Sequence, residues 1–181
     1  MNIPRFYRAA IAISALFIGL AQSAQADIVT LAGDTTGGPT FDRPLVNFSN
    51  YSPNGTGAVY ESIAFTVEDE GEYSITMHGL GFDTFLLLYE TAFDPVAPLI
   101  NGVVANDDLV SLRTSGFAAD LVAGEQYFVV VTGFSSDQFG AYSLTISGDG
   151  VISAVPEPST WLMLAFGVTA FACAQRRKSG D

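Results

Sequence analysis

The sequence has only one cysteine and one histidine, and this scarcity excludes several kinds of site. Cys173 lies in an apolar segment near the C-terminus, so no disulfide can form within the preceding part of the chain. With His78 as the sole histidine, neither an ordinary zinc site of His and Cys ligands nor a Cys–His dyad can be assembled. A Gly-x-Ser-x-Gly elbow and a glycine-rich phosphate loop with lysine are also absent from the sequence. We therefore predict a structural or surface role for His78 and expect no catalysis.

Lysine is missing from the central part of the chain, where acidic residues dominate. Between Asp27 and Val155 the sequence has 17 Asp and Glu residues, and Arg43 and Arg113 are the two basic ones, which gives a formal charge of −15. Such a surface repels nucleic acid and anionic lipid. It favours divalent cations or simply solubility outside the cell, and the composition leaves both readings open.

No apolar run in the sequence reaches the roughly 20 residues that a membrane-spanning helix needs. The N-terminal run, Ala9 to Ala21, has 13 residues and follows two arginines. Ala24 and Ala26 then supply the small side chains that a signal peptidase reads, with cleavage before Asp27. Residues 1–26 are therefore predicted to form a signal helix that is removed on export.

The C-terminal end changes composition at Val155 and has three zones. They are Pro156, Glu157 and Pro158, then the uncharged segment Trp161 to Ala174, then Arg176, Arg177 and Lys178. The two prolines end the last strand and favour an extended stretch, whereas the uncharged segment is apolar on every face and predicts a membrane helix. This helix would be about 21 Å long. That length is short for a hydrocarbon core of about 30 Å, and the basic cluster favours the cytoplasmic side.

Together these three zones resemble the PEP-CTERM sorting segment of exported bacterial proteins, over residues 155–181. The resemblance implies that an exosortase, a membrane enzyme, recognises the tail and cleaves at or near Pro156-Glu157-Pro158. It also implies a producer that makes exopolysaccharide and a location at the outer face of the membrane, the cell surface or the extracellular matrix. The tail is then either removed or kept as a membrane anchor.

The part between these two ends, residues 27–154, shows the alternation and turn residues of an all-β domain. We predict strands at Ile28 to Ala32, Leu45 to Phe48, Val59 to Val67, Tyr73 to His78, Thr84 to Tyr89, Phe117 to Leu121, Gln126 to Thr132 and Ala141 to Ser147. About eight strands suggest a single jelly-roll-like β-sandwich, flanked by the N-terminal signal helix and the C-terminal hydrophobic helix. The runs Phe85 to Tyr89 and Tyr127 to Val131 are apolar on both faces, so we expect them to be central strands covered on both sides.

A short pattern, Gly-x-Tyr-Ser-aliphatic-Thr, occurs at residues 71–76 and again at residues 140–145. Each copy begins a strand after a glycine turn. We interpret the two copies as similar strands in the two halves of the sandwich.

The body also resembles the bacterial pre-peptidase C-terminal (PPC-like) β-sandwiches. The residues that carry this resemblance are Phe65-Thr66-Val67, Gly71-Glu72-Tyr73, Gly81 to Tyr89, Asn106-Asp107-Asp108, Leu121, Ala123-Gly124 and Tyr127. The resemblance implies a sandwich fold but no single function, because such modules accompany many proteins.

A group of loop residues carries the oxygen ligands that calcium prefers: Asp83, Glu90, Asp94, Asn106, Asp107 and Asp108. Among them Asp83, Asp107 and Asp108 are the candidate calcium ligands, although Asp and Asn also stabilise turns without any metal. Loop aromatics could stack on sugar rings or cover the core: Tyr51, Phe82, Phe93, Phe134 and Phe139.

The sequence thus predicts an exported, non-catalytic surface or matrix protein associated with exopolysaccharide. Two alternatives stay open, a calcium-assisted carbohydrate-binding module and a hydrolase that uses surface carboxylates.

Overall fold

The computed structural model of the protein describes residues 26–155. Within this range lie one short 3-10 helix, η1 (Pro53–Gly55), and ten strands: β1 (Ala26–Asp34), β2 (Thr40–Phe41), β3 (Ala58–Val67), β4 (Gly71–Gly79), β5 (Thr84–Glu90), β6 (Gly102–Asn106), β7 (Thr114–Leu121), β8 (Tyr127–Gly133), β9 (Ala141–Asp149) and β10 (Ile152–Val155). Residues 26–155 contain no helix long and apolar enough to cross a membrane. The expected signal helix, the sorting motif, the helix from Trp161 to Ala174 and the basic cluster lie outside the described residues.

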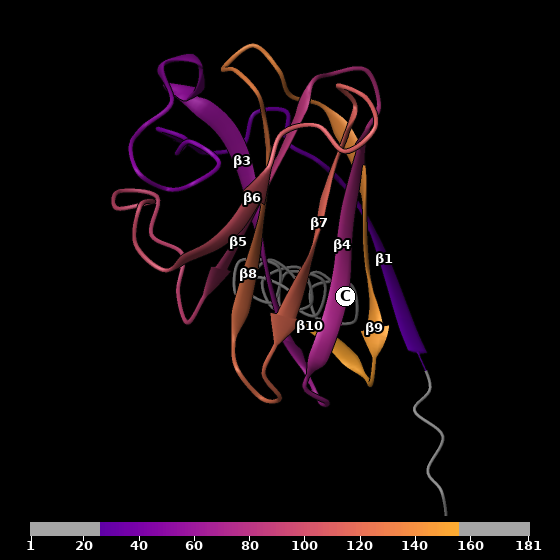
Figure 1. Ribbon diagram of the computed structural model, residues 1–181. Coiled ribbons are helices and arrows are strands. Elements are labelled where there is room, and N and C mark those ends of the chain that lie inside the picture. The colour runs from indigo at the N-terminus through magenta and orange to yellow at the C-terminus, as the bar shows by residue number, and fades with distance from the viewer. Residues whose placement is uncertain (1–25, 156–181) are drawn as a thin grey trace, which may run out of the picture.

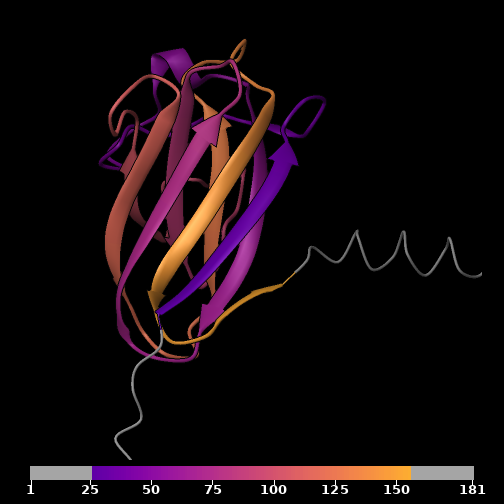
Figure 2. The same ribbon diagram turned by 90° about the vertical axis from the view of Figure 1, so that its right-hand side faces the viewer.

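The strands form two antiparallel sheets that pack face to face (Figure 1). One sheet has the order β1-β9-β4-β7 and faces the viewer in Figure 2, and the other has the order β10-β3-β8-β5-β6 with β2 paired to β3. Without β2 and β10, the eight remaining strands have jelly-roll order, in which successive strands change sheet except for the hairpin β5–β6. The predicted all-β sandwich is therefore confirmed.

The main core lies between the two sheets and follows from simple alternation along the strands. Tyr73, Ile75 and Met77 of β4 are buried there, and β9 contributes residues at every second position in the same way. The intervening residues of β4 point to solvent on the outer face, as the period of two requires. This sheet thus has one apolar face and one wet face.

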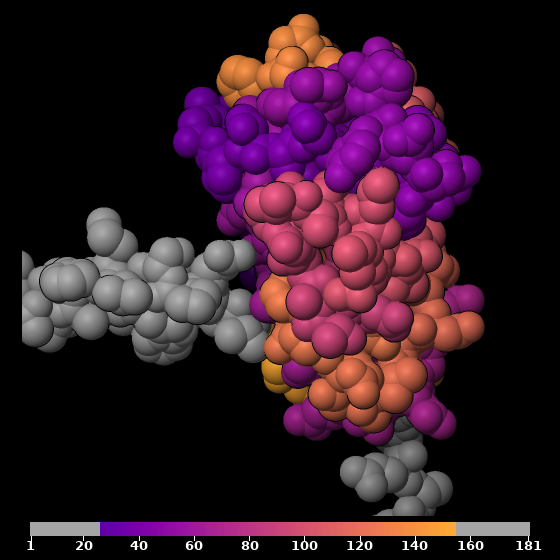
Figure 3. All heavy atoms as spheres, turned by 90° about the vertical axis from the view of Figure 1, so that its left-hand side faces the viewer, coloured from indigo at the N-terminus to yellow at the C-terminus, as the bar shows by residue number. Residues whose placement is uncertain are grey.

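The other sheet buries both of its faces, because loops cover its outer side. Phe85, Leu87 and Tyr89 of β5 form a second apolar cluster there with residues from the segments before β3 and after β5. Figure 3 shows this side, where indigo-to-purple and pink segments lie over the sheet. The Tyr89 hydroxyl donates a buried hydrogen bond of 2.8 Å to the Pro98 carbonyl, which ties one covering loop to the sheet. The prediction that β5 and β8 are central strands covered on both sides is confirmed.

The strand predicted at Leu45 to Phe48 is wrong, because this segment is a turn in the covering loop. Leu45 accepts a backbone hydrogen bond from the Phe48 N–H, and Phe48 has a φ of 55° that no strand allows. The Phe48 ring packs against Tyr89 and lies where a side chain at Gly102 would be. The Phe48 ring is thus half-buried on the sheet without strand pairing, whereas Leu45 and Val46 are exposed.

Three observed strands were not predicted: β2, β6 and β10. β2 and β10 are short, with two and four residues. β6 begins at Gly102, and glycine does not favour a strand. The sandwich therefore has ten strands in the described range, not eight. At the N-terminal side β1 begins at Ala26, one residue before the predicted cleavage position, and pairs there with Asp149.

The two copies of the Gly-x-Tyr-Ser pattern lie in neighbouring strands of one sheet, so their assignment to separate halves is wrong. Ile75 of β4 pairs with Ile146 of β9. Each copy places a tyrosine ring across a glycine of an adjacent strand: Tyr73 over Gly148, and Tyr142 over Gly33. The absent side chains make room for the rings in the core.

This arrangement predicts a specific coupling between Gly33 and Tyr142. Gly33→Ala should lower the free energy of unfolding by about 1–3 kcal/mol, because the new methyl group would overlap the Tyr142 ring. In a Tyr142→Leu background the same substitution should be nearly neutral, whereas Gly148→Ala, which meets Tyr73 instead, should keep its full effect. Denaturant unfolding of the parent, the two single variants Gly33→Ala and Tyr142→Leu, and the double variant measures this coupling. An equal effect of Gly33→Ala in both backgrounds would contradict the packing described.

Candidate functional site

The structure brings the three predicted calcium ligands together at one end of the sandwich. Asp83 immediately precedes β5 and Asp107 immediately follows β6, and these antiparallel strands are neighbours, with Leu86 paired to Asn106. One carboxylate oxygen from each of Asp83, Asp107 and Asp108 lies within 4.8 Å of the others. The loops that carry them are at the top of Figure 1. We call these three residues the acidic cluster.

Hydrogen bonds from neighbouring loops hold the backbone of the acidic cluster. The Asp83 N–H donates to Gln138 Oε1 at 2.8 Å, and the Asp83 carbonyl accepts from the Phe134 N–H at 3.0 Å. The Ser115 hydroxyl donates to the Asp107 carbonyl, and the Gly116 N–H donates to Asn106 Oδ1 at 3.1 Å. These bonds leave the carboxylates free to face one another.

Two carboxylate oxygens of the acidic cluster are buried without a hydrogen-bond partner, namely Asp83 Oδ1 and Asp107 Oδ1. Burial and the nearby Asp108 and Asp83 carboxylates raise the pKa of Asp107 to about 6. The same causes, burial first and then Asp108, raise the pKa of Asp83. Concentrated negative charge and unpaired oxygens are the conditions under which a bound cation stabilises a site.

Arg43, which sequence reasoning did not connect with these aspartates, lies beside them and is almost fully buried, with 1% of its surface exposed. Its guanidinium stacks 3.7 Å from the centre of the Phe85 ring and donates hydrogen bonds to the carbonyls of Pro44 and Phe134. Burial lowers the pKa of Arg43 to about 10, while the Asp107 and Asp83 charges act in the opposite direction. The sequence did contain one signal that could have drawn attention to Arg43: it is one of two basic residues between Asp27 and Val155.

The remaining residues of the predicted calcium group do not join the acidic cluster. Glu90 ends β5 at its far end from Asp83, and Asp94 is an exposed loop residue whose carboxylate accepts a hydrogen bond from the Val96 N–H at 2.9 Å. Asn106 lies next to the cluster but uses Oδ1 on Gly116. His78 is exposed on β4, where it pairs with Thr114 and Ser143.

The loop aromatics proposed as sugar platforms have separated roles. Phe82 is buried in the core between the sheets, whereas Phe93 and Phe134 pack on the outer apolar cluster. Tyr51 and Phe139 are exposed. Only these last two fit the idea of a free stacking platform, and they do not lie on one element.

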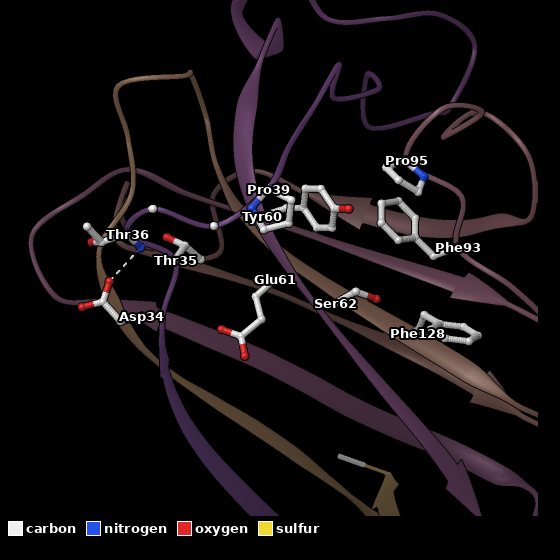
Figure 4. Close-up of a pocket in the computed structure, with 12 residues that line it drawn as sticks. Asp34, Thr35, Thr36, Pro39, Tyr60, Glu61, Ser62, Phe93, Pro95 and Phe128 are labelled. Atoms are coloured by element: carbon white, nitrogen blue, oxygen red, sulfur yellow. Dashed lines mark hydrogen bonds between the residues drawn. The ribbon is translucent and has the colours of Figure 1, made fainter. Parts of the chain in front are cut away.

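A groove that sequence reasoning missed runs along β3, with a cavity volume of about 610 Å³. Its walls are the turn Asp34 to Pro39 on one side and Phe93 and Pro95 on the other, with Tyr60, Glu61, Ser62 and Phe128 between (Figure 4). Tyr60 and Phe93 meet edge to face, with ring centroids 5.3 Å apart. Because the walls come from segments far apart in sequence, no local pattern predicts it.

Comparison with known proteins supplies information about the tail. The family described as the PEP-CTERM protein-sorting motif matches residues 154–178. No curated protein matches the chain. Among solved structures, the CBM35 from Cellvibrio japonicus Abf62 is similar over 71% of this chain and 99% of its own, with 14% identity and a TM-score of 0.35. This likeness is too weak to carry an argument about function, and the resemblance of the body to PPC-like sandwiches is not confirmed.

The sorting motif begins inside β10, at Ala154, so the tail follows the sandwich with no intervening linker. A motif of this kind indicates an exported protein that an exosortase sorts. The chain is therefore an exported β-sandwich that carries a PEP-CTERM sorting tail.

Proposed function

We propose that this protein is a non-catalytic component of the cell surface or extracellular matrix, associated with exopolysaccharide and released or anchored through its tail. The observation that carries the proposal is the sorting motif at residues 154–178, joined directly to one acidic sandwich. The strong negative charge of the body supports a solvated existence outside the cell. The exosortase acts on the tail, so the body is the part that reaches the surface.

The position of the sole histidine supports the non-catalytic reading. His78 is exposed on a strand, and its two paired residues, Thr114 and Ser143, are not carboxylates that could orient an imidazole. A hydrolase that used the acidic cluster would turn over polysaccharide, whereas a surface component binds it without cleavage. Incubation of the protein on polysaccharide arrays separates these two activities.

We further propose that the acidic cluster binds calcium. Three carboxylates supply oxygen ligands of the right type, and calcium takes six to eight, so carboxylates bound through both oxygens and water would complete the shell. The buried, unpaired oxygens of Asp83 and Asp107 fit a cation at this place. Arg43 supplies competing positive charge from one side, which favours moderate rather than tight affinity.

Processing of the tail is the first consequence to test. We expect the mature protein from its native producer to lack most of the segment from Trp161 to Asp181. Replacement of Pro156-Glu157-Pro158 by alanines should leave a longer, membrane-retained form, and so should expression in a host without exosortase. Intact-mass spectrometry measures the C-terminus. A mature chain that still ends at Asp181 would refute processing but would leave simple anchoring possible.

Calcium should raise the thermal unfolding midpoint of residues 27–155, because it binds the folded acidic cluster in preference to the unfolded chain. At a free concentration of about 100 times the dissociation constant the gain is about 2.7 kcal/mol. Asp108→Asn should abolish most of the shift, and because Asp108 is exposed this variant should still fold. Asp120→Asn, an exposed position on β7 outside the cluster, is the matched control. Identical midpoints with calcium and with chelator would remove the proposal.

Without calcium, the acidic cluster should make stability depend on pH through Asp107. The pKa of this group is about 6 in the folded protein and lies above its ordinary value of 3.8. The folded state therefore holds the proton more tightly than the unfolded state, and this contribution to stability is lost as pH rises through about 6.

Asp107→Asn, which cannot ionise, should accordingly be more stable than the parent protein at pH 8, and the difference should shrink as the pH falls below about 6. Denaturant midpoints at several pH values measure the difference, with Asp120→Asn again as control. A difference between Asp107→Asn and the parent that does not change with pH would contradict the assigned environment of Asp107.

A further inference from the structure

Three loops at the acidic-cluster end of the sandwich expose large apolar side chains. Leu80 lies between β4 and β5, Leu109, Val110 and Leu112 lie between β6 and β7, and Phe139 lies between β8 and β9. We call these five exposed residues the apolar loop residues. A single exposed apolar side chain is ordinary, whereas a group of them at one end of a molecule marks a surface that another molecule covers.

Backbone hydrogen bonds hold these loops against one another. The Thr84 N–H donates to the Leu112 carbonyl at 2.8 Å, which joins the first two loops. The Leu80 N–H donates to the carbonyl of Ala141, directly after the third loop, also at 2.8 Å. All three loops lie at the top of Figure 1. The apolar loop residues therefore share one end of the molecule.

The same loops carry the acidic cluster. Asp83 lies three residues after Leu80, and Asp107 and Asp108 directly precede Leu109. Asp108 is the exposed member of the cluster, whereas Asp83 and Asp107 are half-buried. A cation held by the three carboxylates is therefore accessible from the side of Asp108, next to the exposed aliphatic side chains.

Calcium would neutralise this end of an otherwise acidic body. The charged side chains of the three loops, together with that of Arg43 beside them, are Asp83, Asp107, Asp108, Asp137, Arg43 and Arg113. Their formal charge is −2, and one bound calcium ion brings it to 0. Arg113 is the only exposed arginine or lysine in the described range 26–155. An anionic surface that the body as a whole repels thus meets no net repulsion at this end.

We propose that this end of the sandwich docks, when calcium is bound, on a lipid surface whose headgroups carry phosphate. The inference rests on the proposed calcium binding at the acidic cluster. Headgroup oxygens take the places in the calcium shell that water otherwise fills, and Arg113 adds an exposed positive charge for the same headgroups. The apolar loop residues enter the layer beneath the headgroups.

The chemistry of the side chains favours a lipid surface over other occupants. Four of the five apolar loop residues are leucine or valine, which have no ring face to stack on a sugar and no hydrogen-bonding group. A second copy of the chain would bring another body of formal charge −15, and the two would repel. A phosphate-bearing lipid supplies both anionic oxygens and an apolar layer. Such docking holds the exported body at a membrane surface without any contribution from the tail.

Vesicle sedimentation with residues 27–155 tests the docking in the absence of the tail. The ten strands, apart from Ala26 of β1, and both apolar clusters lie in this range, so the body has its own core and folds alone. The vesicles contain phosphatidylglycerol mixed with phosphatidylcholine. We expect calcium to raise the vesicle association constant at least about tenfold over the value with chelator.

Matched double variants test whether the apolar loop residues make the contact. Val110→Ser with Leu112→Ser changes side chains that are 84% and 61% exposed, and Val96→Ser with Ile100→Ser changes an equally exposed pair, 85% and 61%, in the loop after β5. The first variant should lose at least about tenfold in vesicle affinity, whereas the second should bind like the parent. Because all four positions are exposed, both variants should fold and keep the calcium-induced rise of the melting midpoint.

The melting midpoint separates failure of the docking from failure of calcium binding. A calcium-induced rise without vesicle binding would overturn the docking and leave the calcium site in place. Vesicle binding that the Val110→Ser, Leu112→Ser variant fully retains would do the same. Midpoints and vesicle binding that are both identical with calcium and with chelator would remove both proposals. Complete displacement from vesicles by glycerol 3-phosphate at an equal phosphate concentration would show a site for phosphate alone, and would also overturn the lipid surface.

Discussion

The need to bury both faces of β5 and β8 determines how the rest of the molecule is arranged. These central strands are apolar at nearly every position, and a sheet with two apolar faces cannot leave one of them in water. The four-stranded sheet covers the inner face, and the loops before β3 and after β5 cover the outer one. The covering loops in turn deliver Arg43 to the acidic cluster and form the walls of the groove.

The acidic cluster and Arg43 illustrate how a buried charge is tolerated at the end of such a sandwich. The guanidinium is stacked on Phe85 and bonded to two carbonyls and to Ser52, so most of its donors are satisfied without a direct carboxylate contact. The nearby aspartates supply opposite charge but repel one another, and burial together with this repulsion raises the pKa of Asp107. An added divalent cation would relieve that repulsion, and protonation at low pH would relieve it in another way. Under the proposed calcium binding, the same three residues connect the stability of the body to its ionic surroundings.

The sorting tail and the sandwich are joined more closely than two separate modules would be. The matched motif starts within β10, and that strand pairs with β3, which also lines the groove. Residues 154 and 155 thus belong both to the sheet and to the matched motif.

Several features could be predicted from the sequence because they depend on local pattern or on composition. Alternation along residues 27–154 predicted an all-β sandwich, and the apolar runs predicted the central strands. The order of motif, apolar segment and basic cluster marked the tail. Carboxylates in the predicted loops were enough to nominate Asp83, Asp107 and Asp108.

Other features were decided only by tertiary structure. Phe48 has strand-like neighbours, yet its ring is needed on the outer face beside Tyr89, so the backbone turns with a positive φ. Arg43 approaches the aspartates from a loop that lies 40 residues before Asp83 and 64 before Asp107 in sequence, and the groove arises from which strands pair. Local pattern reports which residues favour burial, but long-range pairing decides which segments bury them. That pairing depends on contacts between residues far apart in the chain, and no short stretch of sequence contains them.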